Sequence, residues 1–143
     1  MNAFERKLEE LSRLIWDLKE RTTEGAVVIV EGRKDVESLR RLGISGMILP
    51  AKSSGRPFLD VVGEIGRLGV KEAILLMDFD RRGREWTMRL MEHLEAMKVK
   101  SDITFWKRLI GLAGREVKDV EGLARYLETL SEKIGKNILD GNQ

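Results

Sequence analysis

Three carboxylates stand where an apolar segment of the chain stops. Glu31 follows the apolar residues 26–30, and Asp78 and Asp80 follow residues 73–77. Clustered carboxylates repel one another and raise each other's pKa unless a cation neutralises them. Oxygen ligands without histidine or cysteine suit a hard divalent ion such as magnesium. Each carboxylate alone is more typical of an exposed loop residue or a helix cap, so a metal site requires that the fold bring them together.

The composition leaves carboxylates as the main reactive groups. The chain has 143 residues, no cysteine and one histidine. Disulfides, cysteine-ligated zinc and thiol catalysis are excluded, and a His-rich metal site or a Ser-His-Asp triad is disfavoured. The net charge is only +2, so contact with nucleic acid needs a local basic patch or a metal ion. No apolar run approaches the ~18 residues of a membrane span, and residues 1–10 lack a signal core, so we expect a cytoplasmic protein with no membrane partner.

Short apolar strands alternate with amphipathic helices. Apolar runs without polar alternation predict buried strands at 26–30, 47–49 and 73–77, and residues 102–106 predict a fourth strand. Apolar periodicity and loop composition predict the other segments: helices at 3–20, 33–42 and 58–68, a helix after Gly83 as far as Met97, a short helical piece at 107–113, a last helix at 120–134, and a loop at 50–57. We expect one domain over 25–143, with residues 1–24 as an N-terminal helix packed on it.

This alternation indicates βαβ units with right-handed crossovers and a parallel sheet. All strands of such a sheet end at one edge, and ligands bind there, where the strand order switches direction. If the first and third strands are neighbours, as in the order 2-1-3-4, Glu31, Asp78 and Asp80 meet at that edge. A magnesium ion held by them would bridge to the phosphate oxygens of a substrate.

Two segments resemble the motifs of the Toprim domain family. Residues 27–35, VVIVEGRKD, are similar to its first motif, an apolar strand with an essential glutamate, a glycine and often a Lys-Asp pair. Residues 75–83, LLMDFDRRG, are similar to its second, an apolar strand followed by Asp-x-Asp-x-x-Gly. The family's domain is shared by bacterial-type primases, type IA and type II topoisomerases, overcoming-lysogenization-type nucleases and a ribosomal RNA maturase. The whole chain is most similar to small stand-alone Toprim proteins, mainly archaeal.

The resemblance covers residues 26–106 and implies a fold and site roles. The implied fold is α/β and Rossmann-like, with a four-stranded, mostly parallel sheet in the order 2-1-3-4 flanked by helices, and with extra helices at both ends. Glu31 corresponds to the family's catalytic glutamate, a general acid or base in nucleotidyl transfer or phosphodiester cleavage. Asp78 and Asp80 correspond to the ligands of Mg²⁺, or of Mn²⁺ in its place. Gly32 and Gly83 are expected to allow tight turns and close backbone approach.

Two features of the sequence qualify this correspondence, one at Arg84 and one at the acidic pair Asp119 and Glu121. The family's topoisomerases and maturase usually place an acidic residue directly after the second glycine, where this chain has Arg84, so a third ligand there is not expected. Asp119 and Glu121 lie at the start of the last predicted helix, and some Toprim nucleases carry a similar Asp-x-Glu, which implies further metal ligands. The alternative is structural, since Asp119 is a good N-cap and Glu121 suits a first helical turn.

Basic residues close to the predicted sheet edge are candidates for binding the phosphates of DNA or RNA. Helix N-termini favour anions in general, and Lys34 lies in the first turn of the helix predicted at 33–42. The alternative for each is an ordinary solvated charge. The candidates are Lys34, Lys52, Arg56, Arg81, Arg82 and Arg84.

Two functions remain open at this stage. The first is a Mg²⁺-dependent enzyme acting on nucleic-acid phosphodiesters, either a nuclease or a primase-like nucleotidyltransferase. The second is a non-catalytic Toprim module that binds nucleic acid or recruits a protein partner. Topoisomerase activity is disfavoured, because Tyr126 is the single tyrosine and type IA enzymes carry theirs in a separate domain. The resemblance also leaves open a homodimer or a place in a larger nucleic-acid-processing assembly.

Overall fold

In the part of the chain that the structure describes, six helices surround a central sheet of four strands. The computed structural model describes residues 2–52 and 58–135, so Arg56 lies outside the described residues. In chain order the elements are α1 (Ala3–Thr23), β1 (Val27–Val30), α2 (Arg33–Arg41), β2 (Ile48–Pro50), α3 (Phe58–Arg67), β3 (Glu72–Leu76), α4 (Arg81–Ala96), β4 (Lys100–Asp102), α5 (Thr104–Ala113) and α6 (Leu123–Ile134).

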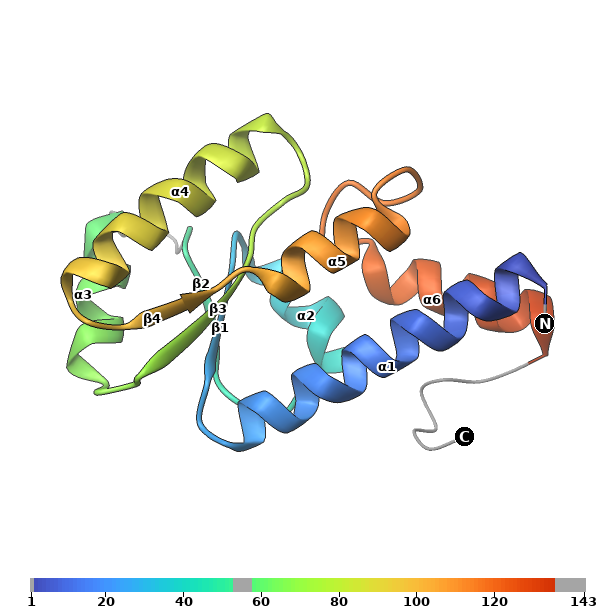
Figure 1. Ribbon diagram of the computed structural model, residues 1–143, viewed down its shortest axis with the longest axis horizontal. Helices are drawn as coiled ribbons and strands as arrows, with labels where there is room; N and C mark the ends of the chain where they lie inside the picture. The colour runs from blue at the N-terminus through green and yellow to red at the C-terminus, as the bar shows by residue number, and fades with distance from the viewer. Residues whose placement is uncertain (1, 53–57, 136–143) are drawn as a thin grey trace.

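The sheet is entirely parallel and has the predicted order β2-β1-β3-β4 (Figure 1). All four residues of β1 are buried, which explains why its sequence lacks polar alternation. Val28 and Val30 pack into one core with α1, α2, α5 and α6, whereas Val27 and Ile29 pack into a second core with α3 and α4. Three layers result, with helices on both faces and all strand ends at one edge. None of the helices among the described residues is long and apolar enough to cross a membrane.

The fourth strand lies earlier in the chain than predicted. The structure has β4 at Lys100–Asp102, and the expected strand over 102–106 is wrong because the chain is helical from Thr104. The Asp102 Oδ1 accepts a hydrogen bond from the Thr104 N–H at 2.8 Å, which ends the strand and starts α5. Phe105 and Trp106 have high strand propensity, but here they begin the apolar face of a helix and are buried against the sheet.

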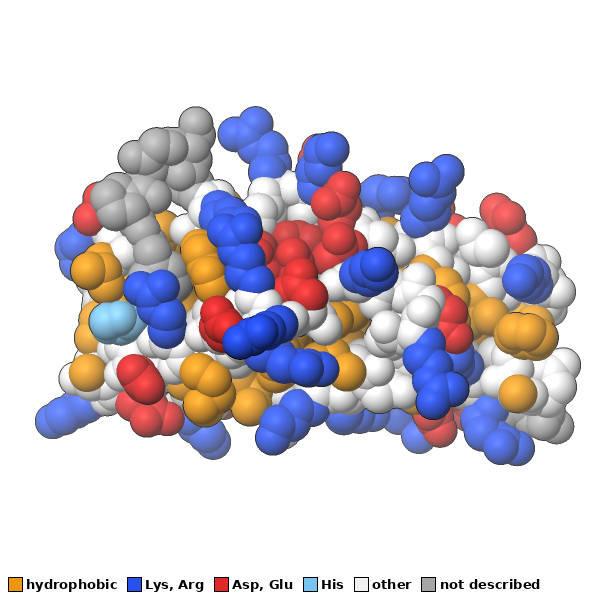
Figure 2. Space-filling view, turned by 90° about the horizontal axis from the view of Figure 1, so that it is seen from above, with side chains coloured by type: hydrophobic (Ala, Val, Ile, Leu, Met, Phe, Trp, Pro, Cys, Tyr) orange, Lys and Arg blue, Asp and Glu red, His pale blue; other side chains and the backbone are white. Residues whose placement is uncertain are grey.

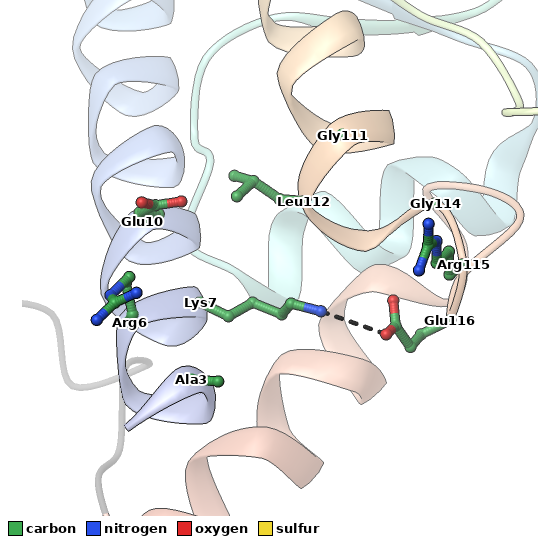
Figure 3. A pocket seen from close by; sticks show the side chains of 9 residues that line it. All are labelled: Ala3, Arg6, Lys7, Glu10, Gly111, Leu112, Gly114, Arg115 and Glu116. Carbon is green, nitrogen blue, oxygen red and sulfur yellow. Dashed lines mark hydrogen bonds and ion pairs between the residues drawn. The ribbon is translucent and has the colours of Figure 1, made fainter. Parts of the chain in front are cut away.

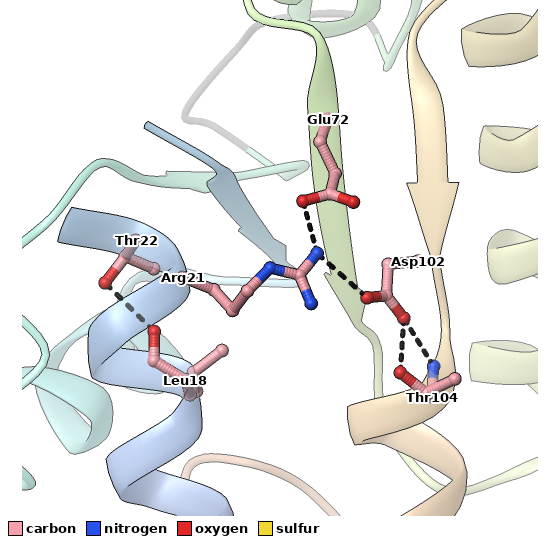
Figure 4. Close-up of polar contacts among 6 residues, drawn as sticks. All are labelled: Leu18, Arg21, Thr22, Glu72, Asp102 and Thr104. Carbon is pink, nitrogen blue, oxygen red and sulfur yellow. Dashed lines mark hydrogen bonds and ion pairs between the residues drawn. The ribbon is translucent and has the colours of Figure 1, made fainter. Parts of the chain in front are cut away.

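Arg21 ties the end of α1 to the sheet (Figure 4). Its guanidinium donates a hydrogen bond to Glu72 of β3 and lies 3.2 Å from the Asp102 Oδ2 of β4. We call these three side chains the Arg21 network. Partial burial acts to raise the pKa of Asp102, but hydrogen bonds from Thr104 and the charge of Arg21 hold it below its usual value. In this network Asp102 therefore stays ionised and paired with Arg21.

Candidate functional site

Glu31 and Asp78 meet at the edge where the strands end. Glu31 follows β1 directly and is only 5% exposed, and Asp78 stands just past β3, the strand paired with β1. The Glu31 Oε2 accepts a hydrogen bond from the Asp78 N–H at 2.8 Å, and the two carboxyl groups also share a side-chain hydrogen bond. The parallel register thus brings together two of the three carboxylates that the sequence singles out.

Two further carboxylates face this pair. Asp35, in the first turn of α2, is 6% exposed and accepts hydrogen bonds from the Gly32 N–H at 2.9 Å and from the backbone of Glu121. Asp119 lies in the segment between α5 and α6, and its charge acts on both Asp35 and Asp78. We call Glu31, Asp35, Asp78 and Asp119 the carboxylate cluster.

The segment between α5 and α6 is fastened over the sheet edge by backbone hydrogen bonds. The Phe79 N–H donates to the Lys118 carbonyl at 2.8 Å, next to Asp78 on one side and Asp119 on the other. The Asp119 Oδ1 accepts from the Gly122 N–H at 2.9 Å, which closes a turn before α6. The N-cap of α6 is Gly122, so the expected N-cap role of Asp119 and the expected place of Glu121 in the first helical turn are wrong. Asp119 instead closes the preceding turn and contributes charge to the cluster.

The charged forms of Asp78 and Asp35 are disfavoured in the carboxylate cluster. Burial and the charges of Glu31, Asp35 and Asp119 raise the pKa of Asp78 to about 8. Burial is also the main cause that raises the pKa of Asp35, and the charges of Asp119 and Glu31 add to it against two backbone hydrogen bonds. The four carboxylates offer oxygen donors only, the chemistry that Mg²⁺ and Mn²⁺ prefer, so the residues present fit such an ion.

Asp80 is used differently from Asp78. It is the N-cap of α4, and its Oδ1 accepts a hydrogen bond from the Gly83 N–H at 2.7 Å. Within residues 2–52 and 58–135, no three acidic or histidine side chains are arranged as a ready-made metal-binding group. The expected meeting of Glu31, Asp78 and Asp80 therefore takes the form of a close Glu31–Asp78 pair with Asp80 in a helix cap.

The two motif glycines also differ. A Cβ on Gly83 would lie 1.9 Å from the Asp78 carbonyl oxygen, so the backbone of Asp78 can pack against α4 only if residue 83 is glycine. Gly32 has an extended backbone with φ of −141°, and a Cβ there would meet the Asp35 Oδ2 only at 4.0 Å. The chain itself therefore requires glycine at 83 and not at 32.

Basic side chains surround the acidic residues on this face of the molecule (Figure 2). The Lys52 Nζ lies 3.5 Å from the Glu31 Oε1, and the Lys34 Nζ lies 4.0 Å from the Glu121 Oε1. Arg81 is almost fully exposed and pairs with Glu85 one helical turn later at 3.3 Å. Arg82 and Arg84 are exposed in the first turn of α4. Lys52 alone of these candidates makes an ion pair with a member of the carboxylate cluster in the described structure.

Two further residues belong to this region. Asp35 is predicted only as part of the first motif, although its spacing from Gly32 is that of a residue that caps its own helix. Trp86 is not among the predicted site residues, yet its ring has the Lys52 Nζ 5.5 Å and the Arg82 guanidinium 5.7 Å from its centre. The signal for Trp86 was its spacing of four residues from Arg82 on one helix, which places both side chains on one face.

A separate hollow of about 350 Å³ lies between the start of α1 and the end of α5 (Figure 3). Lys7 points across it and pairs with Glu116 at 3.2 Å, and Arg6 and Arg115 stand at its sides. None of the four cluster carboxylates lines this hollow. The candidate site is therefore the open sheet edge rather than this cavity.

Comparisons with known proteins agree with this fold. The family model described as "Toprim domain" matches residues 25–105. A UPF0292 protein of Methanosarcina acetivorans is 34% identical to this chain, and the match covers 94% of this chain and 92% of that protein. A UPF0292 protein of Methanocaldococcus jannaschii is also 34% identical, and the match covers 87% of this chain and 91% of that protein. A solved structure of a protein from Aquifex aeolicus superimposes with a TM-score of 0.65 at 28% identity, covering 78% of this chain and 95% of that one.

Proposed function

This chain belongs to the Toprim domain family, and from that premise we propose that it performs Mg²⁺-dependent chemistry on nucleic-acid phosphodiesters, as a nuclease or a nucleotidyltransferase. Family membership supports a nucleic-acid-related role, and Toprim domains generally bind Mg²⁺. The finer assignment of reaction and residues is our proposal. It concerns the open sheet edge with its carboxylate cluster and basic surroundings.

The observation that carries the proposal is the electrostatic state of Asp78. Its pKa is raised to about 8 by burial and by neighbouring carboxylates, beside a Glu31 that is itself buried. Grouping like charges in this way costs stability, and a divalent cation is the partner that would relieve it. Asp78 is therefore the residue on which we expect a metal ion to depend most.

Each acidic residue has a distinct proposed role. Asp78 holds the ion, with Asp80 and Asp119 contributing the carboxylate oxygens that their own turns leave unused. When bound, Mg²⁺ supplies polarisation of the phosphate and a counter-charge for the oxygen that develops negative charge. Glu121 is left out of the proposed ligand set, because its exposed carboxylate lies beside Lys34.

Glu31 is the proposed general acid or base. The Asp78 N–H binds its Oε2, and Lys52 faces its Oε1, so its carboxylate is held in one orientation. A carboxylate positioned in this way takes a proton from the attacking oxygen or returns one to the leaving oxygen. Lys34, Lys52, Arg81, Arg82 and Arg84 are proposed to bind the phosphates of the strand, as cations beside a helix N-terminus do.

A second function, a non-catalytic module that binds nucleic acid, is favoured by one observation. Asp80 is committed to a helix cap, and the described residues contain no ready-made group of three metal ligands. In that case the carboxylate cluster would set the structure of the edge, and the basic residues alone would bind nucleic acid.

Cleavage of single-stranded RNA and DNA in Mg²⁺ tests the choice between the two. We expect strand cleavage by the wild-type protein and a loss of about 10²- to 10⁴-fold in Glu31→Gln, the usual contribution of a positioned acid or base. Glu37→Gln, an exposed glutamate on α2, is the matched control and should keep full activity. Activity that is absent, or equal in the Glu31 variant, would exclude catalysis at this site. Nucleic-acid binding without cleavage would then support the module.

A further inference from the structure

Trp86 presents an indole ring at the same sheet edge as the carboxylate cluster. It lies in the second turn of α4, and its side chain packs against the core formed by α3, α4 and the sheet while remaining partly exposed. Its inner part is therefore held in place by packing. A ring fixed in this way loses little conformational freedom when a ligand covers its exposed part.

Lys52 connects this ring to the carboxylate cluster. Its ammonium lies 5.5 Å from the centre of the Trp86 ring and 3.5 Å from the Glu31 Oε1. One small charged group thus separates the aromatic surface from the proposed general acid or base. A nucleotide joins its phosphate to its base through a single sugar, so a strand with a phosphate at the cluster has a base within reach of Trp86.

We propose that Trp86 is a stacking platform for an unpaired base, so that the preferred ligand is single-stranded nucleic acid. This inference rests on the proposed function and names the form of its substrate. Stacking on an aromatic side chain raises affinity by about 5- to 150-fold per base, and every base has a face that can stack. Bases inside a duplex are already stacked on one another, so a paired strand gains nothing from this ring.

Displacing the Arg82 guanidinium from the ring costs less than stacking gains. The Arg82 guanidinium lies 5.7 Å from the ring centre, and its side chain is exposed at the start of α4. An exposed cation–π contact of this kind contributes only about a two- to fivefold factor to an equilibrium constant. Once released, Arg82 stands beside the strand and can pair with a backbone phosphate, which compensates for the lost contact.

The other two tryptophans provide internal controls. Trp106 is buried and its Nε1 donates to the Met77 carbonyl at 2.9 Å, so it cannot stack on a ligand. Trp16 is 52% exposed on α1, which packs on the opposite face of the sheet from α4. An effect of stacking should therefore belong to Trp86 and not to exposed tryptophan in general.

The test measures binding of short single-stranded DNA and RNA oligonucleotides. Each is compared, in a separate measurement, with an abasic strand of the same length and charge. Fluorescence anisotropy in Mg²⁺, with Glu31→Gln as background to prevent turnover, gives the dissociation constants. We expect wild-type Trp86 to bind the base-bearing strand about tenfold more tightly than the abasic strand. Trp86→Leu should remove that preference, Trp86→Phe should retain most of it, and Trp16→Leu should leave it unchanged.

The outcomes separate this inference from the proposed function. Equal binding of base-bearing and abasic strands by the protein with Trp86 intact overturns the platform but leaves a nucleic-acid-binding site, and this comparison needs no variant that must fold. Binding of neither strand overturns the proposed function as well. Tighter binding of a duplex than of the single strand also overturns the platform. If only the RNA or only the DNA arm shows the preference, that arm identifies the sugar of the ligand.

Discussion

Two groups of carboxylates lie in this small domain, and their surroundings are opposite. In the Arg21 network, Glu72 and Asp102 share one guanidinium, and the pKa of Asp102 is lowered. In the carboxylate cluster, burial and like charge raise the pKa of Asp78 to about 8. The first group behaves as structural charge that is paired within the chain. The second holds Asp78 mostly protonated at neutral pH, which is the arrangement expected where a cation from outside takes the place of the proton.

The largest predicted effect is at Gly83, which holds the backbone of the second group in place. Gly83→Ala puts a methyl group 1.9 Å from the Asp78 carbonyl oxygen, so Asp78 or the start of α4 must move. We expect a loss of about 3 kcal/mol in the free energy of unfolding, measured by urea denaturation. Gly111→Ala in α5, where a Cβ meets nothing within 4 Å, should instead be neutral or slightly stabilising. Equal stability of both variants would contradict the close packing at Gly83.

The second-largest predicted loss of stability follows removal of Arg21, the cation that Glu72 and Asp102 share in the Arg21 network. Arg21→Met leaves Glu72 and Asp102 partly buried without their partner, and we expect a loss of about 2 kcal/mol in the free energy of unfolding. Arg13→Met on the same helix removes an exposed pair with Glu9 and should cost under about 0.5 kcal/mol. If the two variants lose the same amount, the Arg21 network is no more than an ordinary surface contact.

The affinity for a metal ion should depend on pH in a way that only the carboxylate cluster can produce. Because the pKa of Asp78 is about 8, the ion must displace a proton at lower pH. We expect the affinity for Mn²⁺, measured by calorimetry, to rise up to about tenfold per pH unit from pH 6 and to level off above about pH 8. Asp102→Asn should not change this profile, whereas Asp78→Asn should abolish it. An affinity that is flat over this range would show that Asp78 is not a ligand.

The smallest predicted effect is a gain in stability on removal of the Asp78 carboxylate in the absence of metal. An acid with a raised pKa in the folded state stabilises the protein below its unfolded value of 3.8, and that contribution is lost as the pH rises through about 8. Without metal, Asp78→Asn should therefore be more stable than the wild type at pH 9 by about 1 kcal/mol, and the gain should shrink toward pH 6. Thermal unfolding at several pH values measures it. Destabilisation at pH 9 would mean that the carboxylate makes contacts worth more than the repulsion.

The core of the fold follows from features that the sequence displays directly. Residues 27–30 and 73–76 are apolar without alternation, and that pattern has few solutions other than strands covered on both faces. The strand at 102–106 was misplaced because Phe105 and Trp106 favour strands by propensity, while a single turn at Asp102 and burial of one helical face decided otherwise. Local preference is weak there, and tertiary packing outweighs it.

The site could be predicted only as far as strand register determines it. Glu31 and Asp78 occupy equivalent positions after paired strands, so their meeting follows from the sheet order. The position of Asp119 depends on a backbone hydrogen bond between Phe79 and Lys118, which no spacing in the sequence encodes. Asp80 caps α4 through a short-range hydrogen bond from the Gly83 N–H, and the Asp-x-Asp spacing alone does not distinguish this role from one at the sheet edge.

The hydrogen bond from Phe79 to the Lys118 carbonyl has a consequence for when the carboxylate cluster forms as the protein folds. The family match ends at residue 105, yet Asp119 reaches the carboxylate cluster from beyond it. The segment that carries Asp119 joins α5 to α6, and both helices cover the face of the sheet that Val28 and Val30 present. A domain generally folds as a unit, so the last carboxylate of the cluster is added by the same packing of helices that completes the core.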